Sequence, residues 1–96
     1  MLIVSAKITT KPGKRDAFIK GAQPCIAATR KEDGCHFYEL YASTENPNLV
    51  MYFEKWTDRA ALDKHLKAPH MAEFDKVKAE QDLVEGDMDL GIYEIK

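Results

Sequence analysis

The order of strand and helix patterns along the chain constrains its fold more than any other feature. Residues 2–10 alternate and are rich in β-branched side chains, so they predict a strand with Leu2, Val4, Ala6 and Ile8 on one face. The later patterns predict, in order, a helix at 14–32, strands at 35–43 and 49–56, a helix between Asp58 and Pro69, a second helical piece from about His70, and a strand at 83–95. This order is typical of ferredoxin-like βαββαβ folds of the α+β class, with an antiparallel sheet.

Glycine, proline and aspartate positions add detail to these elements. Pro24 lies inside the first helical pattern, where we expect a kink because proline lacks a backbone donor. Gly34 is expected to cap the end of that helix, and Thr57-Asp58 to cap the start of the next. Gly86 and Gly91 fall in the last strand pattern, where they indicate β-bulges.

Composition is that of an ordinary globular protein, and the length predicts one domain over residues 1–96. The formal net charge is -2, which argues against nucleic acid or an anionic membrane as partners. The two cysteines, Cys25 and Cys35, are too few for a disulfide framework. No apolar run approaches the roughly 20 residues that span a bilayer. We therefore expect a protein of the cytoplasm.

The strand at 49–56 carries apolar side chains on both faces. Leu49, Met51 and Phe53 lie on one face, and Val50, Tyr52 and Trp56 lie on the other. The two predicted helices can cover only one face of the sheet. We expect a second copy of the chain to cover the other face through a two-fold contact, which makes the protein a homodimer.

Two passages resemble the antibiotic-biosynthesis monooxygenase family. The first has the family's pattern of E-x-W, a helix and H-x-x-x-P-H, carried by Phe53-Glu54-Lys55-Trp56-Thr57-Asp58, Ala61-Leu62, His65 and Pro69-His70-Met71. The second, residues 31–38, is similar to the "EEGC…Y" passage of quinol-monooxygenase-like members. The resemblance implies a dimeric α+β barrel with a cavity between each sheet and its helices. The known activities of that family are cofactor-free oxygenation of quinols and anthrones, haem degradation, and action on a phosphorylated signalling molecule.

His65 is the first candidate catalytic residue. Its spacing from Leu62 and Leu66 turns the imidazole toward the sheet. A buried imidazole near a carboxylate can act as a general base near neutral pH. A satisfied core histidine is the alternative reading.

Glu54 is the second candidate catalytic residue. It shares a strand face with Trp56 and Tyr52, so two aromatic rings flank one carboxylate that could orient a flat phenolic substrate. Alternatively, Trp56 is core and Glu54 pairs with a lysine. Tyr38 and His36, on one face of the neighbouring strand, are predicted to line the cavity, with sheet packing as the alternative.

His70 and Lys7 complete the candidate substrate-binding residues. His70 could be a helix cap, a cavity-wall residue or a surface group, and Lys7 could face the cavity as an anchor for phosphate. Residues five apart on a helix point roughly 140° apart, and Pro69 breaks the helix between His65 and His70. No cysteine or third histidine is spaced to complete a ligand set, so the two histidines are not expected to share a metal. Trp56 precedes the helix on which haem-degrading relatives carry a tryptophan, which argues against haem degradation. The prediction is that no cofactor is used.

Three functions remain open from the sequence. The first is a cofactor-free monooxygenase that oxidises a small quinol or phenol with dioxygen. In this function His65, aided by Glu54, removes a proton, and the substrate anion passes an electron to oxygen. The second is an isomerase, or another proton-shuttling enzyme, that acts on a small phosphorylated carbonyl compound. The third is a non-enzymatic dimer that binds a small ligand.

Overall fold

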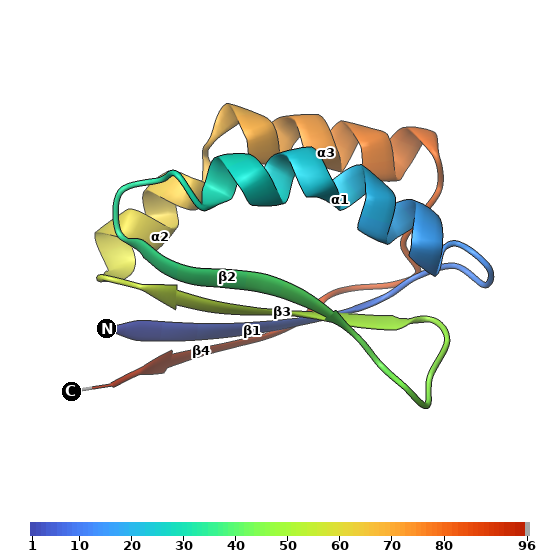
Figure 1. Ribbon diagram of the computed structural model, residues 1–96, viewed down its shortest axis with the longest axis horizontal. Coiled ribbons are helices and arrows are strands. Elements are labelled where there is room, and N and C mark those ends of the chain that lie inside the picture. The colour runs from blue at the N-terminus through green and yellow to red at the C-terminus, as the bar shows by residue number, and fades with distance from the viewer. Residues whose placement is uncertain (96) are drawn as a thin grey trace.

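A computed structural model describes residues 1–95. Its elements are β1 (Leu2–Thr9), α1 (Arg15–Thr29), β2 (Cys35–Ala42), β3 (Leu49–Trp56), α2 (Arg59–Leu66), α3 (Pro69–Glu80) and β4 (Asp89–Glu94). The four strands form one antiparallel sheet in the order β2-β3-β1-β4. All three helices lie on the same face of this sheet (Figure 1). The predicted ferredoxin-like α+β fold is therefore confirmed.

The sheet register places the alternating apolar residues as predicted. β1 lies at the centre, where Val4 pairs with Glu54 of β3 and with Ile92 of β4. Residues of β1 and β3 at these positions point toward the helices and are buried, whereas their neighbours along each strand point to the other face. Because the side-chain period of a strand is two, this register assigns every residue of both strands to a face.

The first helix differs from its prediction in its end. α1 runs as one helix from Arg15 to Thr29 with Pro24 inside it, and it ends before Gly34. Gly34 lies in the following turn with a φ of 85°, so the expectation that it caps the helix is wrong. A Cβ atom on Gly34 would stand 2.6 Å from the Cβ of Ala61, so the turn needs glycine for space as well as for conformation.

The second helix begins as predicted. The Asp58 carboxylate accepts a hydrogen bond from the backbone N–H of Ala61 at 2.9 Å, which is the expected N-cap. α2 ends before Pro69, and Ala68 has extended dihedrals. α3 then starts with Pro69 as its first residue, where the missing N–H costs nothing.

The expected bulges of the last strand are not found. Gly86 has a φ of 69° and precedes β4, whereas Gly91 pairs in regular register with Ser5. The register shift of the sheet lies instead in β2, between Cys35 and Phe37. β4 is the most exposed strand, because the helices do not extend over this edge of the sheet.

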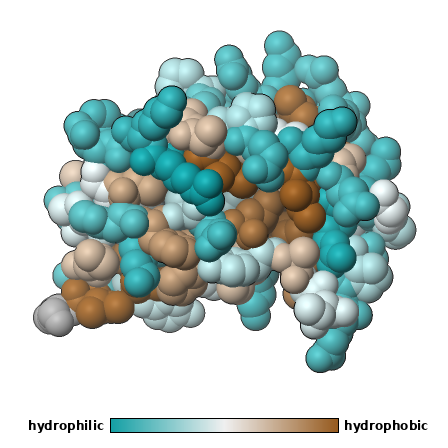
Figure 2. Space-filling view, viewed as in Figure 1, coloured by the Kyte–Doolittle hydropathy of each residue, from teal (hydrophilic) through white to brown (hydrophobic). Residues whose placement is uncertain are grey.

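The two layers leave apolar surface uncovered. In Figure 2, hydrophobic side chains form a band between the polar helical layer and the sheet. The face of the sheet away from the helices carries half-buried Leu49, Met51 and Phe53 of β3, and Phe37 of β2. Among the described residues, no helix is both long enough and apolar enough to cross a membrane.

Candidate functional site

A cavity of about 260 Å³ lies between the sheet and the helices α2 and α3. Most of its wall is apolar and is formed by side chains that include Val4, Ala6, Ile8, Leu62, Met71 and Phe74. Its polar lining from the sheet and α2 comes from Tyr38, Tyr52, Glu54 and His65. A small ring with a polar end fits such a lining, since an apolar pocket with a few polar groups is the usual form of a small-molecule site.

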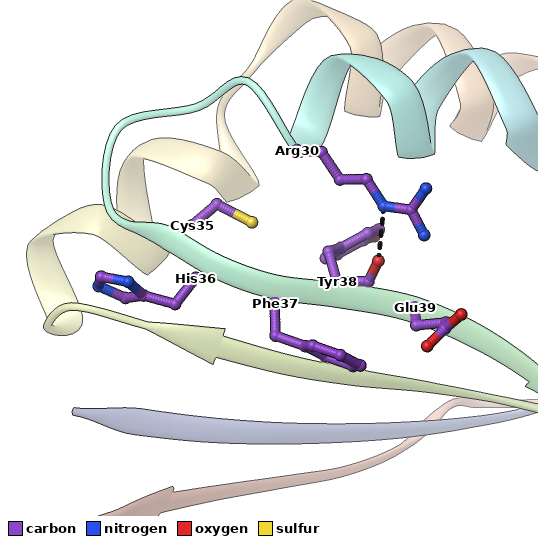
Figure 3. A pocket seen from close by; sticks show the side chains of 6 residues that line it. All are labelled: Arg30, Cys35, His36, Phe37, Tyr38 and Glu39. Carbon is purple, nitrogen blue, oxygen red and sulfur yellow. Dashed lines mark hydrogen bonds between the residues drawn. The ribbon is translucent and has the colours of Figure 1, made fainter.

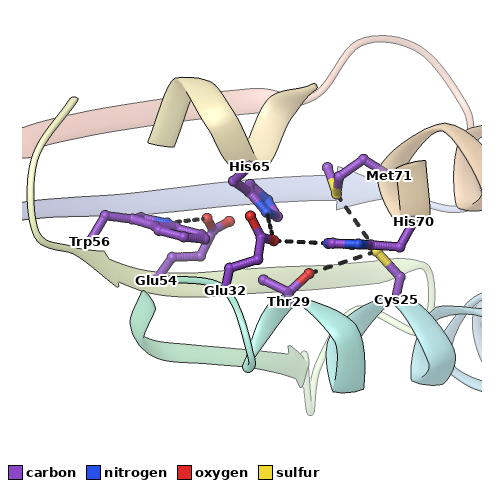
Figure 4. A network of polar contacts seen from close by, with 8 residues as sticks. All are labelled: Cys25, Thr29, Glu32, Glu54, Trp56, His65, His70 and Met71. Atoms are coloured by element: carbon purple, nitrogen blue, oxygen red, sulfur yellow. Dashed lines mark hydrogen bonds and ion pairs between the residues drawn. The ribbon is translucent and has the colours of Figure 1, made fainter. Parts of the chain in front are cut away.

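The centre of the polar network is Glu32, which the sequence reasoning did not single out. Its Oε2 atom accepts hydrogen bonds from Nδ1 of His65 at 2.7 Å and from Nε2 of His70 at 2.8 Å (Figure 4). Glu32 lies in the turn after α1, and the two histidines come from α2 and α3. The chain direction changes at Pro69, so both imidazoles can reach one carboxylate.

His65 is held in one orientation by this contact. An ionised carboxylate can only accept, so Nδ1 of His65 carries the proton and Nε2 of the neutral ring carries none. Every fully buried side-chain nitrogen or oxygen of the described residues has a hydrogen-bond partner. Nε2 of His65 has no hydrogen-bond partner among the described residues, so it must reach open space, and the cavity is the space that His65 lines.

The surroundings of His65 keep its ring neutral. The side chain is 1% exposed, and its ring lies 4.6 Å from the ring of Trp56 and 5.5 Å from that of Tyr38, between centroids. Burial lowers the pKa of His65, and the hydrogen bond from the ring to Glu32 opposes this effect. A neutral imidazole with a bare Nε2 is the form that a general base requires.

Glu54 pairs with a tryptophan instead of a lysine. Nε1 of Trp56 donates a hydrogen bond to Oε1 of Glu54 at 2.9 Å. Burial raises the pKa of Glu54 to about 7, against a smaller lowering by this hydrogen bond. Trp56 itself is fully buried and is not among the residues that line the cavity. It packs behind His65 and fixes Glu54.

Tyr38 and Tyr52 both line the cavity. Their rings lie 5.3 Å apart between centroids. Burial raises the pKa of both phenols, so both keep their protons over the physiological pH range.

The three remaining candidates, Lys7, His36 and His70, do not line the cavity. Lys7 is exposed on the opposite face of the sheet, because its β1 neighbours Ala6 and Ile8 point inward. His36 lies at the irregularity of β2, which breaks its alternation with Tyr38, and its Nε2 lies 2.7 Å from Oγ1 of Thr57. His70 contacts Glu32 instead of the cavity.

Glu32, His65 and His70 also form a set of metal-ligand side chains. Their ligand atoms all lie within 4.8 Å of one another. Two imidazoles and one carboxylate are donors that transition metals accept. The expectation that His65 and His70 point apart is wrong, because Pro69 separates them into two helices.

A second hollow, of about 360 Å³, lies beside the edge strand β2 (Figure 3). It is lined by residues of β2 and by Arg30, which follows α1. Nε of Arg30 donates a hydrogen bond to the backbone oxygen of Tyr38 at 3.0 Å. This contact occupies an outward-facing carbonyl of the edge strand, which is a protective role.

Comparisons with known proteins agree with this fold. A family model described as antibiotic biosynthesis monooxygenase matches residues 1–77. The uncharacterized protein sll1783 of Synechocystis is 36% identical over 94 residues, which cover 98% of this chain and 63% of that protein, so the chain spans less than two thirds of its length. The probable quinol monooxygenase YgiN of Escherichia coli is 32% identical over 98 residues, covering 92% of this chain and 88% of that protein.

Solved structures point to the same family. A conserved protein from Methanosarcina mazei matches with a TM-score of 0.89 and 32% identity, over 99% of this chain and 92% of that one. Rv0793 from Mycobacterium tuberculosis matches with a TM-score of 0.86 and 28% identity, over 99% and 94%. The chain therefore belongs to the antibiotic biosynthesis monooxygenase family, as its E-x-W and H-x-x-x-P-H passages indicate.

Proposed function

We propose that the protein is a cofactor-independent monooxygenase that oxidises a small quinol or related phenol with dioxygen. The observation that carries the proposal is His65, whose Nδ1 lies 2.7 Å from Glu32 and whose bare Nε2 reaches a largely apolar cavity. Family membership as a monooxygenase supports the reaction class. Glu32 acts as the positioning residue that orients the base.

The reaction needs no outside reductant. Nε2 of His65 takes a proton from a substrate hydroxyl, and Glu32 stabilises the imidazolium that results. The electron-rich anion passes one electron to dioxygen, and the two radicals then form a carbon–oxygen bond. For a hydroquinone, the products are a hydroxyquinone and water, with all four electrons supplied by the quinol. The apolar wall excludes water from the anion.

Glu54 has a supporting role in this proposal. With its pKa raised to about 7, a fraction of the carboxyl groups is protonated at neutral pH. The carboxyl lines the cavity near the base, where either form can contact a substrate hydroxyl. The role is secondary because Trp56 already occupies one of its oxygens.

The assembly we propose is a homodimer formed through the outer face of the sheet. That face presents half-buried Leu49, Met51, Phe53 and Phe37, which the protein's own helices cannot reach. A two-fold contact would cover the same patch on both copies.

The phosphorylated-carbonyl alternative loses its main support. Its predicted anchor, Lys7, lies on the far face of the sheet. Among the described residues, Lys78 is the one lysine or arginine that lines the cavity, and its Nζ lies 2.9 Å from Asp75. No specific feature therefore favours phosphate at this site.

Oxygen uptake with a panel of quinols tests the proposal. We expect uptake with at least one quinol, a loss of about 10²-fold or more in His65→Ala, and no loss in His36→Ala, a matched control away from the cavity. Chelation with EDTA should leave the rate unchanged. Equal rates in both variants would contradict the role of His65, and a loss on chelation that iron restores would contradict cofactor independence. Ligand binding without uptake would favour the non-enzymatic alternative.

A further inference from the structure

We infer that the hydroxyl groups of Tyr38 and Tyr52 form a subsite for an oxygen atom of the ligand, so that the cavity selects small rings that carry oxygen over rings of the same size that do not. This inference rests on the proposed function and adds the residues that recognise the oxygen of the substrate. It concerns binding alone, so its test needs no turnover.

Both tyrosine side chains are mostly buried, but their hydroxyls have no hydrogen-bond partner among the described residues. Tyr38 is 5% exposed and Tyr52 is 6% exposed. Neither hydroxyl makes a side-chain hydrogen bond within the described residues, whereas exposed Tyr41 donates to Glu39 at 2.9 Å. Every fully buried side-chain nitrogen or oxygen of the described residues has a hydrogen-bond partner, so each of these hydroxyls must contact open space. The cavity is the hollow that both tyrosines line.

Their chemistry determines what they can bind. Both phenols stay protonated in the buried site, so each has a hydrogen to donate. A buried donor that finds no acceptor loses the free energy of a hydrogen bond. A ligand oxygen can accept from such a hydroxyl, whereas a methyl group of the same size would leave the hydroxyl without an acceptor.

The rest of the cavity restricts the remainder of the ligand. Val4, Ala6 and Phe74 contribute to a wall without hydrogen-bonding side chains. The tyrosines extend from β2 and β3 on the same face of the sheet as Glu54, which is part of the same polar lining. An apolar ring that carries oxygen satisfies both parts, whereas a phosphate would meet only the paired Lys78.

Binding of an isosteric ligand pair tests the inference without any reaction. We would titrate the protein with p-cresol and with p-xylene, which differ by a hydroxyl in place of a methyl, and measure affinity by calorimetry under nitrogen. We expect p-cresol to bind about tenfold more tightly. Tyr38→Phe and Tyr52→Phe should each weaken p-cresol binding several-fold and leave p-xylene binding unchanged.

Tyr41→Phe is the matched control and should change neither affinity, because Tyr41 lies outside the cavity. Equal affinity of the wild type for both ligands would overturn the inference, and this comparison needs no variant to fold. Equal weakening of both ligands in the tyrosine variants would also overturn it, since packing would then explain the effect. Selective p-cresol binding by a protein without oxygen uptake would support this subsite while contradicting the proposed oxygenase.

Discussion

The two faces of the sheet use the same strands in different ways. On β3, Val50 and Glu54 point toward the helices, where packing and hydrogen bonds account for the buried groups. Met51 and Phe53 alternate with them and point outward, where they stay half-buried in the single chain. The inner face therefore carries the candidate site, whereas the outer face keeps apolar side chains half-buried, which is the surface that the proposed dimer would cover.

A charge placed on each face of β3 should have the largest effect, and a different one on each face. Val50→Asp puts a carboxylate at a fully buried position of the inner face, so we expect a loss of more than about 4 kcal/mol and little folded protein. Phe53→Asp, three residues away on the outer face, should fold but remain monomeric. Circular dichroism and light scattering measure the two outcomes. A folded Val50→Asp, or a dimeric Phe53→Asp, would contradict the assignment of the faces.

The buried carboxyl of the inner face should make stability depend on pH. The pKa of Glu54 is raised to about 7 in the folded protein, so the folded state keeps a proton that the unfolded state loses above about 4.5. Stability should therefore fall as the pH rises from about 4.5 to 7, by about 3 kcal/mol from this group.

Glu54→Gln isolates this effect. It keeps an oxygen that can accept from Trp56, so urea unfolding of the variant and the wild type should differ increasingly up to pH 7. His65 contributes to the pH dependence in the opposite direction, because its pKa is lowered in the folded protein and it favours unfolding below its usual pKa. Both proteins carry His65, so its contribution cancels when their free energies of unfolding are subtracted. A difference that does not vary with pH would show that Glu54 is ionised throughout.

The turn that carries Glu32 should be more sensitive than an open turn with the same backbone. Gly34→Ala adds a Cβ that meets Ala61 at 2.6 Å, at a φ of 85°, and should cost about 2 kcal/mol. Gly13→Ala has a similar φ of 77° but meets nothing within 4 Å, and should cost about 1 kcal/mol. Thermal unfolding compares the two. Equal losses would mean that space at the turn has no effect.

The smallest expected effect concerns the start of α2. Asp58→Ala removes the side-chain cap at Ala61 and should cost about 1 kcal/mol. Asp63→Ala removes an exposed ion pair with Arg59 on the same helix and should cost about 0.4 kcal/mol. Urea unfolding of the two variants measures whether the cap contributes more to the free energy of unfolding than the surface pair does. A larger loss in Asp63→Ala would reverse this order.

Local patterns were sufficient to predict the fold and part of the site. The alternation in β1 and β3 identified the strands and their faces, and the spacing of Leu62 and His65 turned the imidazole inward. Tyr38 and Tyr52 were placed at the cavity for the same reason. These features depend on neighbours along one element, so a sequence carries them directly.

The remaining site depends on contacts between elements. Glu32 lies in a turn, and its role exists only because the break at Pro69 brings His70 beside His65. His36 was misplaced because the irregularity in β2 shifts its alternation, which no residue type in that strand reveals. Lys7 was misplaced because its face had to be read from its inward-pointing neighbours in β1.

Glu32 holds the proton of His65 on Nδ1 and leaves Nε2 bare toward the cavity. Long-range ¹H–¹⁵N NMR of the protein with labelled histidine measures this directly at neutral pH. We expect the signals of a neutral ring protonated on Nδ1 for His65, and a change of these signals in Glu32→Ala. A ring protonated on Nε2, or signals that do not change in the variant, would contradict the account.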